Sequence, residues 1–143
     1  MTTPDYQLIY RQARYLVQPE GWGKPWCHSL PLIIGQRTSW LDEMLLFYEE
    51  RTWAFLTAWN PTTGELSLEK NRQRNQCLLE LIQEHPFFHA IGSDQQELYF
   101  EEHYLVLGLT KEESLQLSLH FNQRAFLYGA YEQPTQLVFV HSD

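Results

Sequence analysis

The feature that most constrains the fold is a continuous run of apolar and aromatic residues, TWAFLTAW at 52–59, which ends in Asn60 and Pro61. A strand that is apolar at every position is typical of the buried centre of a sheet. Proline cannot donate a ladder hydrogen bond, and the following NPTTG has the composition of a turn, so the strand should end there. The run therefore predicts a central strand that is buried on both faces.

The segments after this turn predict a helix and then a hairpin. Ser67 is a suitable N-cap for a helix that extends to about Glu84, where Pro86 stops it. Two apolar segments, 87–92 and 104–109, flank a polar loop, and together they predict two paired strands.

The segment that follows the hairpin carries two conflicting patterns. Thr110 and Glu113 have the spacing of a capping box, which marks the start of a helix. Four apolar residues then alternate with a period of two, as in a strand: Leu115, Leu117, Leu119 and Phe121. The capping signal, and the strands expected on either side, lead us to predict a helix. Two further strands, 125–131 and 136–141, should follow it, separated by a turn at Pro134.

Before the central strand we expect a short helix from about Pro4 that passes into a strand ending near Val17, a loop over 18–29, a short strand over 30–35 and a helix over 40–50. Ser39 and Asp42 have the spacing of a capping box at the start of the last of these elements.

From residue 53 to residue 131 the expected order is strand, helix, strand, strand, helix, strand. This is the split βαβ arrangement of ferredoxin-like folds, and right-handed crossovers would place both helices on one face of an antiparallel sheet. A chain of 143 residues is long enough for a single domain with a real core. We therefore predict one α+β domain over 1–143 with a ferredoxin-like βαββαβ core, extended by the N-terminal strands and helix and by a C-terminal strand.

The charge balance limits the partners that the chain can have. It carries 10 Lys and Arg against 18 Asp and Glu, a formal net charge of −8. Bulk electrostatics therefore argue against nucleic acid and against an anionic membrane surface. The N-terminus lacks the apolar segment of a signal peptide, and no apolar run approaches the roughly 18 residues of a membrane helix. We expect a soluble cytoplasmic protein.

The sequence offers little for metal or cofactor chemistry. Cys27 and Cys77 are not part of a CxxC motif, so we expect small buried hydrophobic residues with free thiols. His85 and His89 are four residues apart, but Pro86 breaks the helix that would align them, and we predict no metal site. No glycine-rich phosphate or dinucleotide motif occurs, so no cofactor is predicted.

One face of the helix predicted after the turn carries polar residues where an apolar stripe would be expected: Asn71, Arg74, Asn75, Leu78, Leu81 and Ile82, in that order. An unpaired buried polar group costs about 1–3 kcal/mol. These side chains therefore either find partners within the protein or line a cavity.

The position of this polar stripe suggests an anion site. The N-terminus of a helix favours anions through its free N–H groups. Asn60, Asn71 and Arg74, together with Arg72, could then surround a small pocket. In the alternative interpretation Asn60 caps a turn and Arg74 pairs with a surface carboxylate.

Several segments together resemble a bacterial family catalogued as domain of unknown function 3293: AFLTAWNP, NRQRNQCLLEL, YFEEHYLVLGL and HFNQRAFLYG, with YRQARYLV near the start. The resemblance covers roughly residues 10 to 131. It implies a shared fold and a polar cluster at Thr57, Asn60, Pro61, Asn71, Arg74, Glu101 and Gln123. Asn122 and Arg124 depart from the family pattern, which has Gly and Asn at these positions. The resemblance implies no activity.

Two functions remain open at this point. The first is a non-catalytic binding domain for a small anionic ligand or a partner protein, with these candidate ligand-binding residues: Asn60, Asn71, Arg74, Thr57 and Gln123. The second is a small hydrolase or transferase with Glu101 as general base and Arg74 as anion clamp, although charges at a strand edge that discourage aggregation also explain Glu101. The enzyme hypothesis requires Glu101 to share one cavity with Asn60, Asn71 and Arg74. A homodimer is also left open.

Overall fold

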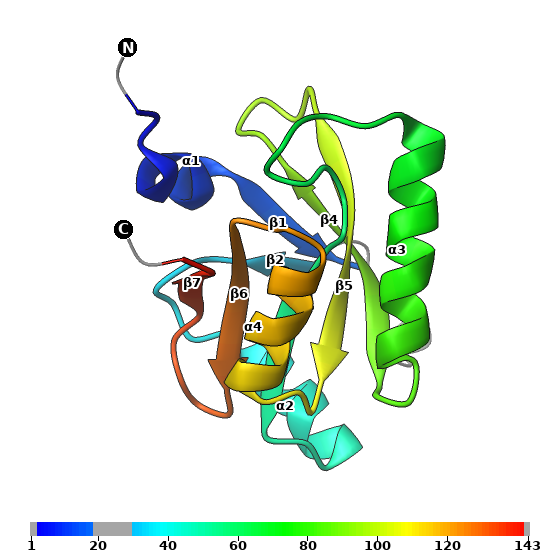
Figure 1. The fold of residues 1–143 in the computed structure, drawn as a ribbon. Coiled ribbons are helices and arrows are strands. Elements are labelled where there is room, and N and C mark those ends of the chain that lie inside the picture. Colours follow the sequence, from blue (N-terminus) through cyan, green and yellow to red (C-terminus); the bar gives the residue numbers. More distant parts are fainter. Residues whose placement is uncertain (1–2, 19–29, 142–143) are drawn as a thin grey trace.

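The computed structural model describes residues 3–18 and 30–141. Their elements are α1 (Tyr6–Gln12), β1 (Arg14–Val17), β2 (Leu30–Leu32), α2 (Ser39–Tyr48), β3 (Thr52–Leu56), α3 (Leu68–Ile82), β4 (Phe87–Ser93), β5 (Phe100–Leu107), α4 (Lys111–His120), β6 (Ala125–Ala130) and β7 (Gln136–Phe139). The strands form one antiparallel, strongly curled half-barrel sheet in the order β2-β1-β4-β5-β3-β6-β7 (Figure 1).

The predicted central strand, β3, lies between β5 and β6 and is buried on both faces. On one face Phe55 packs in a core that includes Met44 and Leu45 of α2. On the other face Leu56 packs in a second core with Leu78 of α3. A continuous apolar strand sequence is required here because neither face of β3 meets water.

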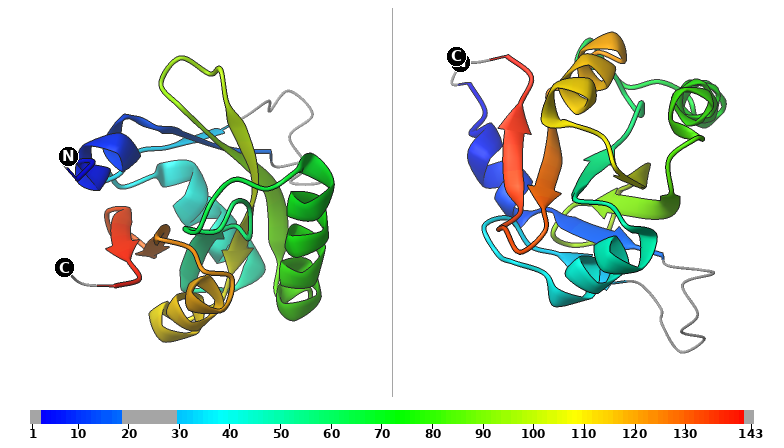
Figure 2. Two further views of the ribbon diagram at one scale, coloured as in Figure 1. Left: turned by 45° about the horizontal axis from the view of Figure 1, so that its top comes forward. Right: turned by 90° about the horizontal axis from the view of Figure 1, so that it is seen from below.

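The helices are distributed over both faces of the sheet. Apolar side chains of α3 and α4 belong to the same core, whereas those of α2 belong to the core on the opposite face. The view from below in Figure 2 shows α2 across the sheet from α3 and α4. The short helix α1 lies near β7, where the rings of Tyr10 and Phe139 meet edge to face with centroids 5.8 Å apart.

The structure confirms the α+β class, the predicted hairpin and the second capping box. β4 pairs with β5 over the full length of β4, from Phe87 opposite Val106 to Ser93 opposite Phe100. At α4 the Thr110 hydroxyl accepts from the Glu113 N–H at 3.0 Å, and the Glu113 carboxylate accepts from the Thr110 N–H at 2.9 Å. The curled half-barrel does not by itself establish the ferredoxin-like core.

The predicted capping box at Ser39 is wrong. The N-cap of α2 is Thr38, which makes no side-chain capping bond, and Ser39 is the first helical residue. Asp42 instead accepts from the Glu132 N–H at 2.8 Å and from Arg37 Nε at 3.0 Å. The carboxylate thus ties α2 to the turn between β6 and β7, a long-range partner that sequence spacing does not reveal.

The expected burial of Leu81 on α3 also needs correction. Leu81 is 58% exposed, because it lies about a quarter-turn away from the buried line through Asn71, Asn75, Leu78 and Ile82. For the same reason the helix buries a narrower stripe than the one expected.

The cysteine prediction divides in two. Cys77 is a free thiol but lies exposed on α3, so its expected burial is wrong. Cys27 and the predicted loop beyond Gln18 lie outside the described residues. Among the described helices, none is long and apolar enough to cross a membrane.

The packing of β3 against β6 generates a stability prediction. Gly129 lies opposite Trp53 in the β3–β6 ladder, and a Cβ at Gly129 would lie 2.5 Å from the indole Nε1. Gly129→Ala should therefore destabilise the protein by about 1–3 kcal/mol through overpacking, measured by urea unfolding. The same substitution in a Trp53→Leu background should cost less, because the clashing ring is absent. An equal cost in both backgrounds would contradict this explanation.

Candidate functional site

The ladder between β3 and β5 is opened at one end by a side chain. The last pair is Leu56 opposite Tyr104, and two further residues in the same register would pair Ala58 with Glu102. Instead the Asn75 carboxamide lies between these strands. It accepts from the Ala58 N–H at 2.7 Å and donates to the Glu102 carbonyl at 2.8 Å. We call this arrangement the Asn75 bridge; it replaces a backbone pair with two side-chain hydrogen bonds.

Asn71 and Asn60 continue the replacement of backbone partners one turn earlier on α3. The Asn71 Oδ1 accepts from the Asn60 N–H at 2.7 Å, and its Nδ2 donates to Asn60 Oδ1 at 2.8 Å. The same Asn60 oxygen accepts from the Leu66 N–H at 2.8 Å. Asn60 has a φ of 39°, a left-handed conformation that asparagine tolerates better than most residues. Asn60 thus organises the turn, as the alternative interpretation expected.

Arg74 binds backbone carbonyls. Its Nε donates to the Ala58 carbonyl at 2.7 Å, and its Nη2 donates to the Phe121 carbonyl at the end of α4. The guanidinium also lies 5.9 Å from the centroid of the Phe121 ring. Burial lowers the pKa of Arg74 from its usual value. Arg74 therefore joins α3, the segment after β3 and α4, and the predicted surface carboxylate is not its partner.

Thr57 and Gln123 are two further polar side chains that bind backbone carbonyls near the end of β3. The Thr57 hydroxyl donates to the Glu102 carbonyl at 2.6 Å, and Gln123 Nε2 donates to the Trp59 carbonyl at 3.0 Å. We call these side chains the polar network: Thr57, Asn60, Asn71, Arg74, Asn75 and Gln123. Among the described residues, no buried side-chain nitrogen or oxygen lacks a hydrogen-bond partner. The polar stripe thus finds its partners within the protein, chiefly on the backbone of residues 58–60.

Glu101 lies on the other side of the sheet from α3. Side chains alternate along a strand, and Glu102 faces α3, where its Oε2 lies 3.3 Å from Arg72 Nη2. Glu101 faces the opposite way, and Arg74 is not among its neighbours in the cavity described below. Of the predicted cluster only Asn60 reaches it, through Tyr99: Asn60 Nδ2 donates to the Tyr99 hydroxyl, which lies 3.5 Å from Glu101 Oε1.

Glu101 lines a cavity of about 470 Å³ between α1, β1, β4, the β4–β5 loop and β5. We call it the Glu101 cavity. Tyr10 and Tyr15 contribute from the N-terminal segment, and Gly92 and His103 from the β4–β5 hairpin. A crevice of about 20 Å³ lies beside it, lined in part by His103 and Thr57. The cavity therefore draws side chains from segments far apart in the sequence.

The electrostatics of this cavity are set by burial. Burial raises the pKa of Glu101 to about 7; the hydrogen bond from Tyr99 lowers it and the charge of Glu65 raises it. Burial also raises the pKa of Tyr10 to about 12 and lowers the pKa of His103 to about 4. Near neutral pH His103 and Tyr10 are therefore neutral, whereas the Glu101 carboxyl is partly protonated and partly ionised.

The position of the His103 ring depends on the absence of a side chain at Gly92, and a hydrogen bond of the ring fixes its tautomer. A Cβ at Gly92 would lie 2.8 Å from the His103 Cε1, so a larger residue would displace the ring. The ring lies against Phe55 with centroids 4.7 Å apart. His103 Nδ1 is 3.1 Å from the Glu101 carbonyl oxygen, which can only accept, so Nδ1 carries the proton. Nε2 is then left as an acceptor.

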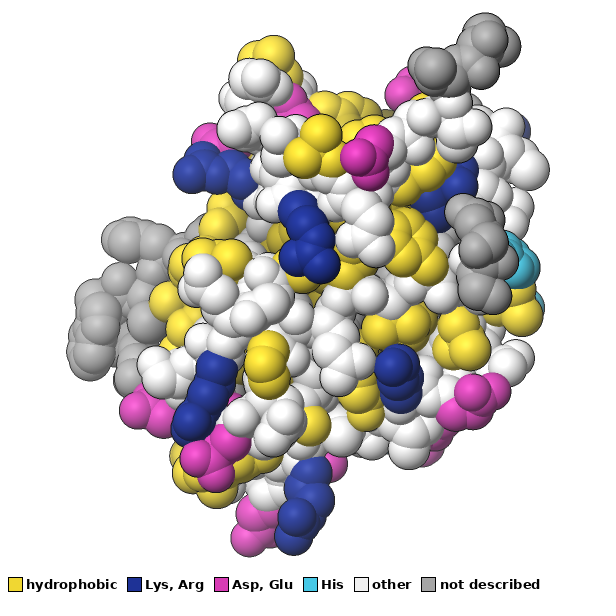
Figure 3. Space-filling model, turned by 90° about the vertical axis from the view of Figure 1, so that its left-hand side faces the viewer, with side chains coloured by type: hydrophobic (Ala, Val, Ile, Leu, Met, Phe, Trp, Pro, Cys, Tyr) yellow, Lys and Arg dark blue, Asp and Glu magenta, His cyan; other side chains and the backbone are white. Residues whose placement is uncertain are grey.

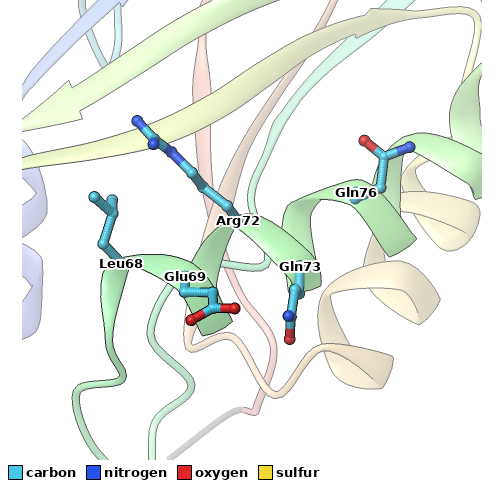
Figure 4. A pocket seen from close by; sticks show the side chains of 5 residues that line it. All are labelled: Leu68, Glu69, Arg72, Gln73 and Gln76. Atoms are coloured by element: carbon cyan, nitrogen blue, oxygen red, sulfur yellow. The ribbon is translucent and has the colours of Figure 1, made fainter.

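A second hollow, of about 420 Å³, lies on the outer surface of α3. Figure 4 shows that its lining side chains, including Arg72, Gln73 and Gln76, all come from this one helix. Side chains from a single helix face do not converge on a bound molecule from several directions. This hollow is therefore a weaker candidate than the Glu101 cavity.

The exposed surface on the side of the molecule that carries α1 is mixed in character. Figure 3 shows hydrophobic side chains in several separate places there, between isolated basic and acidic ones. Within residues 3–18 and 30–141, no three His, Cys, Asp or Glu side chains are grouped so that they could hold a metal ion.

The sequence identified Glu101 but missed the residues that surround it. Tyr99, Glu101 and His103 share one face of the chain by period-two spacing, a signal that was available. The contributions of Tyr10 and Tyr15 depend on the pairing of β1 with β4, which joins residues about 80 positions apart. No local pattern gives that register.

The polar network generates a test of its structural role. Asn75→Ala should destabilise the protein by about 1–3 kcal/mol, because it leaves the buried Ala58 N–H without a partner. It also removes one of the two side-chain hydrogen bonds to the Glu102 carbonyl, which retains the one from Thr57. Arg72→Ala is the matched control on the same helix, since it removes only an exposed ion pair worth about 0–1 kcal/mol. Thermal and urea unfolding measure both. Equal effects of the two substitutions would argue against the Asn75 bridge.

The raised pKa of Glu101 predicts a pH dependence of stability. Its folded pKa of about 7 lies above the usual carboxyl value, so the folded state retains a proton that the unfolded state has lost. The stability that this proton contributes is lost as pH rises through about 7. From about pH 5 to pH 8 the parent protein should therefore lose stability relative to Glu101→Gln, as measured by urea unfolding. A constant difference over this range would show that the carboxyl pKa is not raised.

Comparison with known proteins assigns about half of the chain to a family. Searches against curated proteins and against solved structures found no significant match. A family model described as "Protein of unknown function (DUF3293)" matches residues 56–126, from the end of β3 to the start of β6. This range contains the polar network and Glu101, and it confirms the resemblance over 56–126: this part of the chain is a DUF3293 domain and belongs to that family. The segment YRQARYLV, which was included in the resemblance, lies outside the match.

Proposed function

We propose that the protein is a non-catalytic binding domain that holds a small ligand in the Glu101 cavity. The observation that carries the proposal is the convergence on one cavity of a carboxyl, a neutral imidazole and several tyrosines from α1, β1, the β4–β5 loop and β5. Ligand sites are typically concave, largely apolar, and equipped with a few convergent polar groups of perturbed pKa. The Glu101 cavity has each of these properties.

The anion site predicted at Asn60, Asn71 and Arg74 is less well supported. Arg74 donates to the Ala58 and Phe121 carbonyls, Asn71 donates to Asn60, and Asn60 donates to the Tyr99 hydroxyl. An anion that took the donors of Arg74 would displace its hydrogen bond to the Ala58 carbonyl, and an unpaired buried polar group costs about 1–3 kcal/mol. The polar network supports the proposed function indirectly, because it holds the strand ends that shape the cavity.

The enzyme alternative needs Glu101 as general base and Arg74 as anion clamp around one cavity. Glu101 faces the α1 side of the sheet, and Arg74 donates to carbonyls on the α3 side. This separation favours binding over a hydrolase or transferase mechanism that uses both residues. The pKa of Glu101, about 7, would suit a general base, so the carboxyl is the group on which any catalysis would depend.

We also infer that the central part of the fold is ferredoxin-like. The order β4-β5-β3-β6 is the order expected for the four strands of a βαββαβ unit, with every neighbouring pair antiparallel. The placement of α3 and α4 against one core supports this assignment. The strong curl of the sheet and the helix α2 on the opposite face are additions to that core.

Binding in the cavity can be tested with three small aromatic probes of similar shape: benzamidine, benzyl alcohol and benzoate. Each is titrated into the full chain while backbone amide NMR shifts are followed. At least one probe should shift the amides of Gly92, Glu101 and His103. Ala13→Leu adds volume to the cavity lining and should weaken binding about tenfold, equivalent to about 1.4 kcal/mol.

Gln73→Leu is the control, because it adds the same side chain in the hollow on α3. It should leave the affinity unchanged. Shifts confined to the amides around Gln73 and Gln76, or the absence of shifts with all three probes, would refute the proposed site.

A further inference from the structure

We infer that the ligand of the Glu101 cavity carries a planar cationic group, such as an amidinium or a guanidinium. The inference deepens the proposed function and rests on it. Its basis is the chemistry of the cavity wall, which offers hydrogen-bond acceptors and aromatic faces. Among the described residues that line the cavity, none is a lysine or an arginine.

The acceptors come from two adjacent positions on one face of β5. The Glu101 carboxylate can accept from two donors at once, which suits the parallel N–H groups of an amidinium. His103 presents an unprotonated Nε2, because its Nδ1 donates to the Glu101 carbonyl at 3.1 Å. An anionic ligand would meet the carboxylate and the lone pair of the imidazole and would be repelled by both.

The walls of the cavity are rich in tyrosine. Tyr6, Tyr10, Tyr15 and Tyr99 all line it, and the face of an aromatic ring attracts a cation within about 6 Å. The chain itself contains such a contact at this place: the Arg124 guanidinium lies 3.7 Å from the centroid of the Tyr6 ring. A ligand guanidinium or amidinium would make the same kind of contact with the remaining rings.

The ionisable neighbours of Glu101 do not neutralise it. Among the described residues, those that line the cavity or act on its charge are Tyr6, Tyr10, Tyr15, Asp94, Tyr99, His103 and Glu65. Each is an acid or, in the case of His103, a base that burial keeps neutral at pH 7. Burial raises the pKa of Glu101 to about 7, so at neutral pH a proton competes for the place that a cation would occupy.

This competition gives the inference a pH signature. A cation that pairs with the Glu101 carboxylate must displace the proton, so its affinity should rise with pH through about 7. A neutral probe has no such dependence. Proton release on binding, measured by calorimetry in buffers of different ionisation enthalpy, reports the same event independently.

The experiment compares benzamidine, a planar cation, with neutral benzyl alcohol and anionic benzoate on the full chain. Benzamidine should bind about tenfold more tightly than benzyl alcohol at about pH 8, the effect of one charge-assisted hydrogen bond. Benzoate should bind most weakly. Glu101→Gln should remove the preference for benzamidine, whereas Glu102→Gln should retain it, because the neighbouring side chain faces α3.

The outcomes separate this inference from the proposed function. Equal affinity for benzamidine and benzyl alcohol, or tighter binding of benzoate, would overturn the cation preference and leave the cavity as a binding site. Failure of all three probes to bind would overturn both. The pH dependence is measured on the unmodified chain, so it decides the question even where a variant folds poorly: affinity for benzamidine that stays constant from about pH 6 to pH 8 would refute the pairing with Glu101.

Discussion

The fold depends on how the backbone of residues 58–60 is satisfied after it leaves the sheet. A peptide that departs from a ladder leaves buried N–H and C=O groups, and each must find a new partner. The Asn75 carboxamide has one acceptor and one donor end, so it can stand in for a strand between Ala58 and Glu102. Asn71 and Arg74 serve the next backbone groups in the same way. Side chains on the polar half of α3 therefore supply the hydrogen bonds that a neighbouring strand would otherwise give to residues 58–60.

This replacement shapes the opposite side of the sheet. Residues 100–103 of β5 remain paired with β4 but no longer with β3. The two strands separate where the Asn75 bridge enters, and the small crevice between Thr57 and His103 lies at this separation. The larger Glu101 cavity continues outwards from it towards α1. Substitutions in the polar network should thus affect the cavity as well as stability, although none of its members except Asn60 reaches towards Glu101.

The sequence predicted what local patterns determine. The period-two and helical signals placed most elements. The Thr110 box was predicted from two residues three apart, and the Ser67 cap from a serine directly before a helical segment. Polarity on the inner face of α3 correctly marked residues that need partners. The identity of those partners depended on where β3 ends, and the apolar run TWAFLTAW concealed the departure at Leu56, because residues 58 and 59 are buried outside the sheet as well. The cavity required the β1–β4 register, which is a long-range property.

The contrast among the carboxylates indicates why Glu101 is the exceptional one. Asp42 is paired with Arg37, and Glu102 lies against Arg72. Glu101 instead meets a tyrosine hydroxyl at 3.5 Å and lies within the influence of another acid, Glu65. A carboxyl in such a place is disfavoured as an anion, and burial alone would favour an apolar residue of similar size. Burial has already removed water from the Glu101 carboxylate before a ligand arrives. A bound cation would pair with this carboxylate and offset the free-energy cost of its burial, so the pairing would favour binding.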